Sequence, residues 1–256
     1  MAKRIWTREE TILAFDLYCK TPFGKINKTN KDIIELSRII ERTPSSVSMK
    51  MCNLASHDPE LKKRGVKGLA HGCKMESVIW NEFYNDWELL SMESRIIISD
   101  YKKENFEKHF ILEYEDIPLG KYREQIIKQR VGQDFFRKAV LSAYGNHCCM
   151  TGIAKQELLI ASHIKPWNIC DEKRERTNPE NGLCLNPLHD KAFDRGFITI
   201  DKEYHVRVSS IIENEKCDLA TKKWILDIKD KSIELPRRFL PNKDFIEYHN
   251  DMIFKP

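Results

Sequence analysis

Two histidines and one asparagine stand at the ends of short apolar segments in the second half of the chain. They are His163, Asn181 and His189, spaced 18 and 8 residues apart. Imidazole changes its charge near neutral pH, so a histidine can take a proton from water or, when neutral, bind a divalent cation. An asparagine side chain can hydrogen-bond to nearby backbone and hold a loop. The set suits a hydrolytic site, although the same residues can also simply cap secondary-structure elements.

Local signals place these residues on a strand–loop–strand–helix segment. The apolar residues 157–161 predict a strand just before His163, and residues 182–185 predict a second strand after a long polar loop. Asn186, followed by proline, predicts a helix start, because asparagine caps helices and proline suits the first helical position. His189 then falls in the first turn of that helix. A hairpin followed by a short helix can bring the two histidines onto facing elements.

This arrangement, with the segments ASHIKPW and NPENGLCLNPLHDKAFDRG, resembles the HNH (ββα-metal) endonuclease family, in particular the subgroup seen in prokaryotic restriction-type endonucleases. The likeness extends over about residues 120–256 and includes RVGQDFFRKAVLSAY and ITIDKEYHVRVSS. It implies a nuclease in which His163 is the general base, Asn181 orients the loop beside it, and His189 binds Mg²⁺ or Mn²⁺. It also implies products with 5′-phosphate and 3′-hydroxyl ends.

The sequence departs from the family at a second metal-binding position. Many members carry an aspartate immediately before the catalytic histidine, and Ser162 stands there in this chain. Asp190 and Asp194 are possible replacements. Asp190, however, directly follows His189 and should point roughly 100° away from it on the helix, so we expect it to form ion pairs with basic neighbours instead.

The eight cysteines indicate reduced thiols rather than disulfides or zinc. Adjacent cysteines, as at Cys148–Cys149, rarely form a disulfide. The two CxxC pairs with which many HNH proteins bind structural zinc are not found, so no zinc is expected, and Cys149 and Cys184 are expected to be small core residues. The polar first residues and the lack of an apolar run of ~20 residues predict a cytoplasmic protein without a membrane partner.

The N-terminal third predicts a DNA-binding unit. Residues 1–76 carry 15 Lys and Arg against 9 Asp and Glu, whereas the remainder carries 28 against 30. Three helices are predicted, with a tight turn between the last two, as in a helix-turn-helix. The segments WTREE and RTPSSVSMKMCNL resemble Myb-like or homeodomain-like units. The predicted DNA contacts are Arg42, Ser46, Lys50 and Asn53. The competing interpretation is a helical bundle with a solvated outer face.

A basic amphipathic stretch at residues 120–138 lies directly before the nuclease-like segment. Because affinity for DNA that is independent of sequence comes mainly from phosphate contacts, this stretch predicts a second DNA-binding surface. The predicted phosphate contacts are Lys121, Arg123, Lys128 and Arg130. A solvated helix face explains the same charges equally well.

The predicted fold class is α+β, with a helix-turn-helix-like region at residues 1–75, a helical connector at 76–119 and an HNH domain at 120–256. Residues 56–75 are expected to be a loop or linker. The predicted function is cleavage of double-stranded DNA, as in a type II-like restriction endonuclease, by a homodimer, since one site cuts one strand. The alternatives are a DNA-binding regulator with an inactive HNH domain and a homing or mobile-element nuclease.

Overall fold

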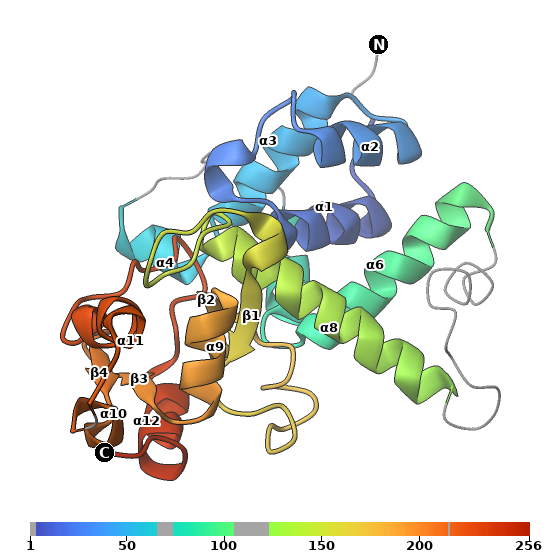
Figure 1. Ribbon diagram of the computed structural model, residues 1–256. Coiled ribbons are helices and arrows are strands. Elements are labelled where there is room, and N and C mark those ends of the chain that lie inside the picture. Colours follow the sequence, from blue (N-terminus) through green and yellow to red (C-terminus); the bar gives the residue numbers. More distant parts are fainter. Residues whose placement is uncertain (1–3, 66–73, 105–122, 215) are drawn as a thin grey trace. The chain divides into compact units, whose positions relative to one another are not determined.

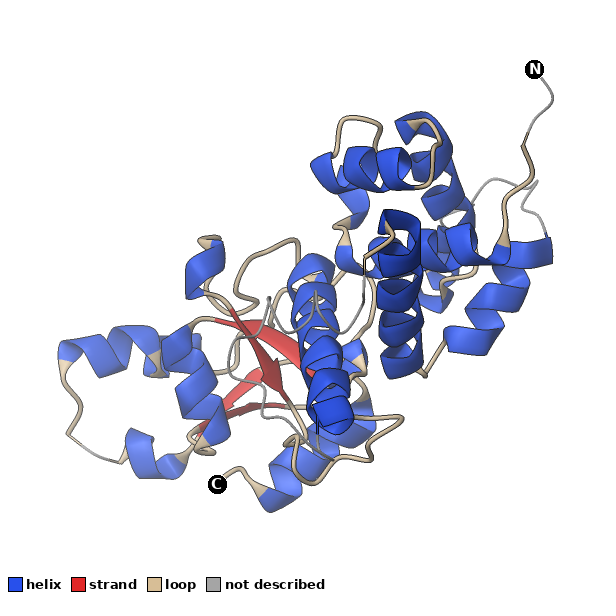
Figure 2. Ribbon diagram, turned by 90° about the vertical axis from the view of Figure 1, so that its right-hand side faces the viewer, coloured by secondary structure: helices blue, strands red, loops and turns tan. Residues whose placement is uncertain are grey.

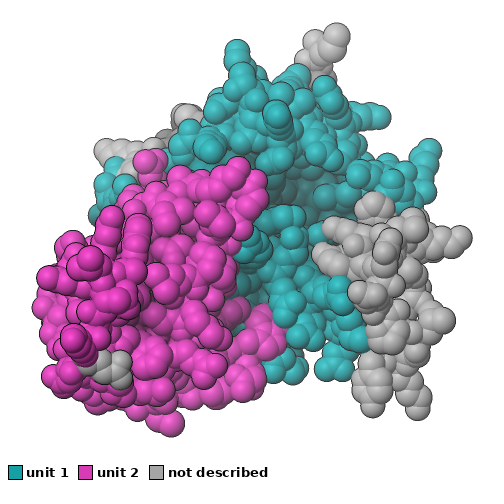
Figure 3. Space-filling model, viewed as in Figure 1, with its two compact units in different colours: residues 1–139, 172–178 teal, residues 140–171, 179–256 magenta. Residues whose placement is uncertain are grey.

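The computed structural model describes residues 4–65, 74–104, 123–214 and 216–256. The chain divides into two compact units, one of residues 1–139 and 172–178 and one of residues 140–171 and 179–256 (Figure 3). This division differs from the predicted boundaries at 75 and 119. One continuous helix, α8 (Arg123–Ala143), begins in the first unit and ends in the second. No helix in the described parts of the chain is long and apolar enough to cross a membrane.

The described part of the first unit is helical (Figure 1). Besides most of α8, its helices are α1 (Arg8–Lys20), η1 (Phe23–Lys25), α2 (Lys31–Ile39), α3 (Pro44–Ala55), α4 (Pro59–Lys63), α5 (Lys74–Phe83) and α6 (Trp87–Lys102). Helices α1, α2 and α3 pack on one another, and α1 also packs against α5 and α6. The core contains aromatic and aliphatic side chains, among them Phe15, Ile33, Met51, Trp80 and Trp87. The predicted order, helices first, is confirmed.

The starts of these helices follow from local side-chain chemistry. Thr7 accepts a hydrogen bond from the backbone N–H of Glu10 at 3.2 Å, and the Glu10 carboxylate accepts one from the N–H of Thr7 at 3.0 Å. This capping box satisfies two of the N–H groups that a helix start leaves open. Thr43 caps α3 through one hydrogen bond, from the N–H of Ser46 at 3.2 Å, and proline is the first residue of that helix. The predicted linker at 56–75 was partly wrong, because Asp58 caps the short helix α4.

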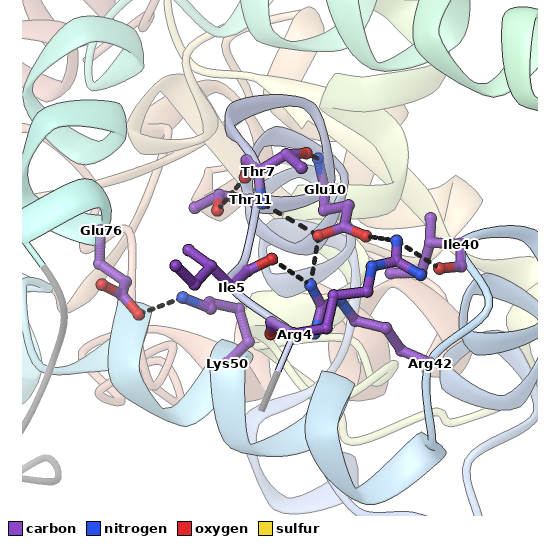
Figure 4. A network of polar contacts seen from close by, with 9 residues as sticks. All are labelled: Arg4, Ile5, Thr7, Glu10, Thr11, Ile40, Arg42, Lys50 and Glu76. Carbon is purple, nitrogen blue, oxygen red and sulfur yellow. Dashed lines mark hydrogen bonds and ion pairs between the residues drawn. The ribbon is translucent and has the colours of Figure 1, made fainter. Parts of the chain in front are cut away.

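A buried network of charged side chains joins the first three helices (Figure 4). Glu10, with a fully buried side chain, pairs with Arg4 and with Arg42 at 2.7 Å. Burial raises the pKa of Glu10, but the hydrogen bond from Arg42 and the charge of Arg4 bring it below its usual value. Lys50 and Glu76 form a second buried ion pair. The contacts of Arg42 tie the turn between α2 and α3 to the N-terminal segment and to the start of α1, and the pair of Lys50 and Glu76 ties α3 to α5.

This network corrects two predicted DNA contacts. The Arg42 side chain is only 7% exposed, and it also donates to the backbone carbonyl of Ile5 at 2.7 Å. The Lys50 side chain is 4% exposed and faces Glu76, not solvent as its helical position predicted. Each charge is neutralised inside the unit, where an unpaired charge would be costly. We therefore assign both residues to holding the helices together.

The second unit contains two β-hairpins and short helices (Figure 2). After the end of α8 its elements are η2 (Gln156–Leu158), β1 (Ile160–His163), η3 (Pro179–Asn181), β2 (Gly182–Leu185), α9 (Pro187–Asp194), β3 (Ile198–Ile200), β4 (Val206–Val208), α10 (Ser210–Glu213), α11 (Leu219–Trp224), η4 (Leu226–Ile228) and α12 (Lys243–Met252). Strands β1 and β2 are antiparallel, and α9 packs against both of them and against β3. The predicted strand–loop–strand–helix order is therefore present.

His249 lies in the core of this unit, as a packed histidine rather than an exposed one. Its ring stacks on Phe193 with 3.7 Å between ring centroids, and its Nε2 donates to the carbonyl oxygen of the same residue at 3.2 Å. Its Nδ1 lies 2.8 Å from the hydroxyl of Thr199. Burial lowers the pKa of His249 to about 4, because a protonated ring would lose its hydration there.

This pKa predicts a loss of stability in acid. Below about pH 6.5 the unfolded chain protonates His249, whereas the folded protein keeps it neutral down to about pH 4. The unfolded state binds the extra proton, so stability falls across this window, by about 3 kcal/mol in total. Urea unfolding of wild type and His249→Gln between about pH 7 and pH 4 measures this. On acidification, His249→Gln should lose less of its free energy of unfolding than wild type. An equal dependence of that free energy on pH in the two proteins would contradict the prediction.

Candidate functional site

His163 is the last residue of β1, where it pairs with Gly182 at the beginning of β2. Its ring is half-buried and lies edge-on to Trp167, with 5.5 Å between ring centroids and 87° between ring planes. Strand pairing fixes the backbone on one side of the imidazole, and the indole limits its rotation. The ring therefore has a defined position while part of it stays open to solvent.

Asn181 fixes the chain on the other side of His163. Its carbonyl accepts from the N–H of Ile164 at 2.9 Å, and its side-chain Oδ1 accepts from the N–H of Lys165 at 2.8 Å. Its Nδ2 donates to the carbonyl of Lys165 at 3.1 Å and to Cys170 Sγ at 3.2 Å. The side chain is fully buried, so these bonds replace its contacts with water. The two residues after His163 are thus tied to the residue before β2.

His189 lies in the first turn of α9, as predicted, but its ring is fully buried. Nε2 lies 2.7 Å from the carbonyl oxygen of Trp224, which can only accept, so Nε2 carries the hydrogen. Nδ1 faces the Asn186 amide at 3.1 Å and Cys148 Sγ at 4.0 Å. Both ring nitrogens are therefore directed at protein groups.

Cys148 and Asn186 were not predicted as site residues. Burial raises the pKa of the Cys148 thiol, whereas its contacts with His189 and Thr151 and the hydrogen bonds from backbone N–H groups bring it down to about 6. Cys149 and Cys184, predicted to be small core residues, are both buried. The seven cysteines that the structure describes are in the thiol form.

The remaining predicted DNA contacts lie in several environments. Ser46 is half-exposed on α3, and Asn53 lies 3.5 Å from the Glu76 carboxylate. On α8, Lys128 pairs with Glu88 at 2.7 Å, and that hydrogen bond raises the pKa of Lys128. Arg130, also on α8, is half-exposed. Lys121 and the side chain of Arg123 lie outside the described residues.

Comparison with known proteins agrees with the geometry of the second unit. Residues 148–201 match the family model described as HNH endonuclease. Among solved structures, the chain is similar to a modification-dependent TagI restriction endonuclease, with 20% sequence identity and a TM-score of 0.29. That match covers 46% of this chain and 37% of the other. No match was found among curated proteins. The family match is confined to residues 148–201, and the HNH endonuclease assignment applies to this segment.

HNH endonucleases typically use a divalent metal, so we tested whether the residues present fit one. Among the described residues, no three His, Cys, Asp or Glu side chains are grouped closely enough to hold a metal ion. Ser162 Oγ is buried without a hydrogen-bond partner, but a hydroxyl is a weak ligand. Both nitrogens of His189 face protein groups. As arranged, with both ring nitrogens bonded to protein groups, the residues do not fit a cation held by His189.

Asp190 was predicted to form ion pairs with basic neighbours. Its side chain is half-exposed on α9. Partial burial and the negative charge of Asp190 raise the pKa of Asp194, one turn further along α9. The outer side of α9 therefore carries two neighbouring carboxylates.

Proposed function

We propose that this chain is a DNA endonuclease, of the type II-like restriction class, with His163 as the general base. The observation that carries the proposal is the position of His163 at the end of β1. Its backbone is held there by strand pairing and by the hydrogen bonds of Asn181, while its ring stays partly exposed. A base must hold a fixed orientation toward the water that it deprotonates, and this arrangement supplies one.

In the proposed reaction, a neutral His163 takes a proton from water, and the resulting hydroxide attacks a DNA phosphate. The bond from phosphorus to the 3′ oxygen breaks, which leaves a 5′-phosphate and a 3′ oxygen that takes up a proton from solvent. Imidazole suits this step because it titrates near neutral pH. Mg²⁺ or Mn²⁺ is the proposed cofactor, although His189 does not fit as its ligand. Asn181 touches neither water nor phosphate in this scheme and acts as a positioning residue.

We expect Asn181→Ala to lower the cleavage rate mainly through kcat, with a smaller effect on the KM for DNA. The variant removes the side-chain acceptor for the N–H of Lys165 and one of the two donors to its carbonyl, at a cost of about 2 kcal/mol in stability, and so loosens the backbone after His163. Asn181→Asp is the matched comparison, because it keeps an acceptor for the N–H and loses the donor. A change confined to KM, or to stability alone, would contradict a positioning role.

We propose that the first unit contacts double-stranded DNA. The support is its basic N-terminal third and the half-exposed Ser46, Asn53 and Arg130, together with Lys121, Arg123 and Lys128. Arg42 and Lys50 are not included, because they are buried in ion pairs. The proposed assembly is a homodimer, since a double-strand cut requires two sites. Phosphate contacts of this kind predict binding that weakens steeply with added salt.

The second candidate function is a DNA-binding regulator whose HNH domain is inactive. It is favoured by the buried ring of His189 and by serine at position 162. Incubating the full chain with supercoiled plasmid, methylated or unmethylated, and with Mg²⁺ or Mn²⁺ separates the two. A nuclease produces nicked and then linear DNA with 5′-phosphate ends. Plasmid that is bound but stays intact under all four conditions would favour the regulator.

A further inference from the structure

Four polar side chains from two separate segments meet in the interior of the second unit. Cys148 and Thr151 lie in the turn that follows α8, and Asn186 and His189 lie at the start of α9. The Asn186 Nδ2 atom is 3.6 Å from Cys148 Sγ, 3.2 Å from Thr151 Oγ1 and 3.1 Å from His189 Nδ1. We call these four residues the polar cluster. It joins two segments that are about 35 residues apart in the sequence.

The orientation of each group in the cluster is set by backbone partners. Asn186 Oδ1 accepts the N–H groups of Leu188 and His189 at 3.0 and 3.1 Å, as a helix cap. Its Nδ2 must therefore point into the cluster as the donor. The carbonyl of Trp224 fixes the hydrogen of His189 on Nε2, so the Nδ1 lone pair accepts from Asn186. Each nitrogen of the imidazole thus has one partner of the right kind.

The spacing within the cluster is that of a metal site, but the donor set is not. Two residues separate Cys148 from Thr151, and two separate Asn186 from His189, as in the paired ligands of structural zinc sites. Only one of the four is a thiol. A hydroxyl and an amide bind zinc poorly, whereas they donate and accept hydrogen bonds well. The cluster therefore connects the turn at 148–151 to α9 by hydrogen bonds.

We propose that His189 is a positioning residue of this cluster, which fixes the first turn of α9 against the turn at 148–151 and the carbonyl of Trp224, and that it is not a ligand of the catalytic cation. A ligand role for Nδ1 would break its bond from Asn186, and one for Nε2 would break its bond to Trp224. The ring is fully buried as well. The inference rests on the proposed function only where it denies His189 a role at the cation.

The first test uses replacement of His189 in the full chain. His189→Ala should lower Tm by roughly 5 °C, because it leaves Asn186 and the Trp224 carbonyl without their partner. His189→Gln, which offers an amide donor to the carbonyl, should restore part of that loss. Isothermal titration with Mn²⁺ should give a Kd for His189→Gln within about twofold of wild type. A Kd raised by about tenfold or more at unchanged Tm would overturn the inference.

A second variant on the same helix serves as a comparison for the Mn²⁺ titration. Asp190→Asn changes the neighbouring side chain, which is half-exposed and lies outside the cluster. If Mn²⁺ binding is lost in Asp190→Asn and kept in His189→Gln, the cation does not need the imidazole, and the inference is supported. The reverse pattern would overturn it.

The second test converts the cluster into a metal site. Thr151→Cys, Asn186→Cys and His189→Cys, combined with the existing Cys148, place four thiols at the four positions. We expect the variant to bind one Co²⁺ with the absorption of a tetrahedral thiolate complex, and one Zn²⁺ that raises its Tm. If the folded variant does not bind Co²⁺, the four side chains do not meet at one point, and the inference is overturned. If the variant does not fold, the His189→Gln results decide. Neither Tm nor the cobalt spectrum depends on DNA cleavage, so failure of the nuclease proposal would be seen separately.

Discussion

Replacing His163 by alanine is expected to lower the rate of DNA cleavage by about 10²–10⁴-fold, the usual contribution of a general base. His163 is half-buried, with the ring of Trp167 nearly perpendicular to its own, so its removal should disturb the fold little. The backbone of the site is held separately, by strand pairing with Gly182 and by Asn181. DNA affinity and Tm should therefore stay close to those of wild type. Single-turnover cleavage of plasmid with saturating protein measures the effect on the chemical step.

The matched control is His205→Ala, which removes another half-buried histidine of the same unit, in the turn between β3 and β4. Its cleavage rate should be that of wild type. Free imidazole added to His163→Ala should restore part of the rate, because a small base can enter the space that the side chain leaves. Wild-type cleavage by His163→Ala, or an equal loss in His205→Ala, would show that His163 is not the base.

The largest effect on stability is expected from Glu10→Ala, at about 3–5 kcal/mol. The substitution leaves the buried guanidinium of Arg42 without its carboxylate, and an unpaired buried charge is costly. It also removes the acceptor for the N–H of Thr7, so the capping box of α1 is lost. Urea denaturation of the full chain, followed by far-UV circular dichroism, measures the change in the free energy of unfolding.

Glu9→Ala is the control for this prediction. Glu9 is exposed in the same turn of α1 and carries the same charge near the helix N-terminus, so its loss should cost at most about 0.5 kcal/mol. The difference between the two variants separates the combined effect of the buried ion pair and the capping box from that of the helix dipole. Equal effects of the two substitutions would mean that the network in Figure 4 contributes little to stability.

Features that depend on neighbouring residues could be predicted from the sequence. The caps of α1 and α9 could be predicted, because Thr7 and Asn186 accept hydrogen bonds from backbone N–H groups two or three residues away. The second strand was predicted at its observed residues, 182–185, since a short apolar run between polar segments marks it. Once the β–β–α order was known, His163 and Asn181 fell beside one another at the hairpin. The caps depend on bonds between residues close in the sequence, and the placing of His163 beside Asn181 follows from the pairing of the two strands.

Features that depend on distant residues could not be predicted in this way. The helical position of Lys50 indicated a solvent-facing side chain, but Glu76, 26 residues further along the chain, buries it in an ion pair. A lysine enters a core only where a carboxylate compensates its charge, and no local pattern shows where that carboxylate will lie. The same limit applies to Arg42, whose partner Glu10 is 32 residues away.

The sequence alone determined that this protein carries an HNH segment, because residue types, spacing and caps are local properties. The tertiary structure decided what each residue of the segment contacts. It left His163 partly exposed and turned both nitrogens of His189 toward the protein, through Asn186 nearby and the carbonyl of Trp224, 35 residues away. A histidine can bind a cation or accept and donate hydrogen bonds, and only the groups that folding brings to its ring select between the two.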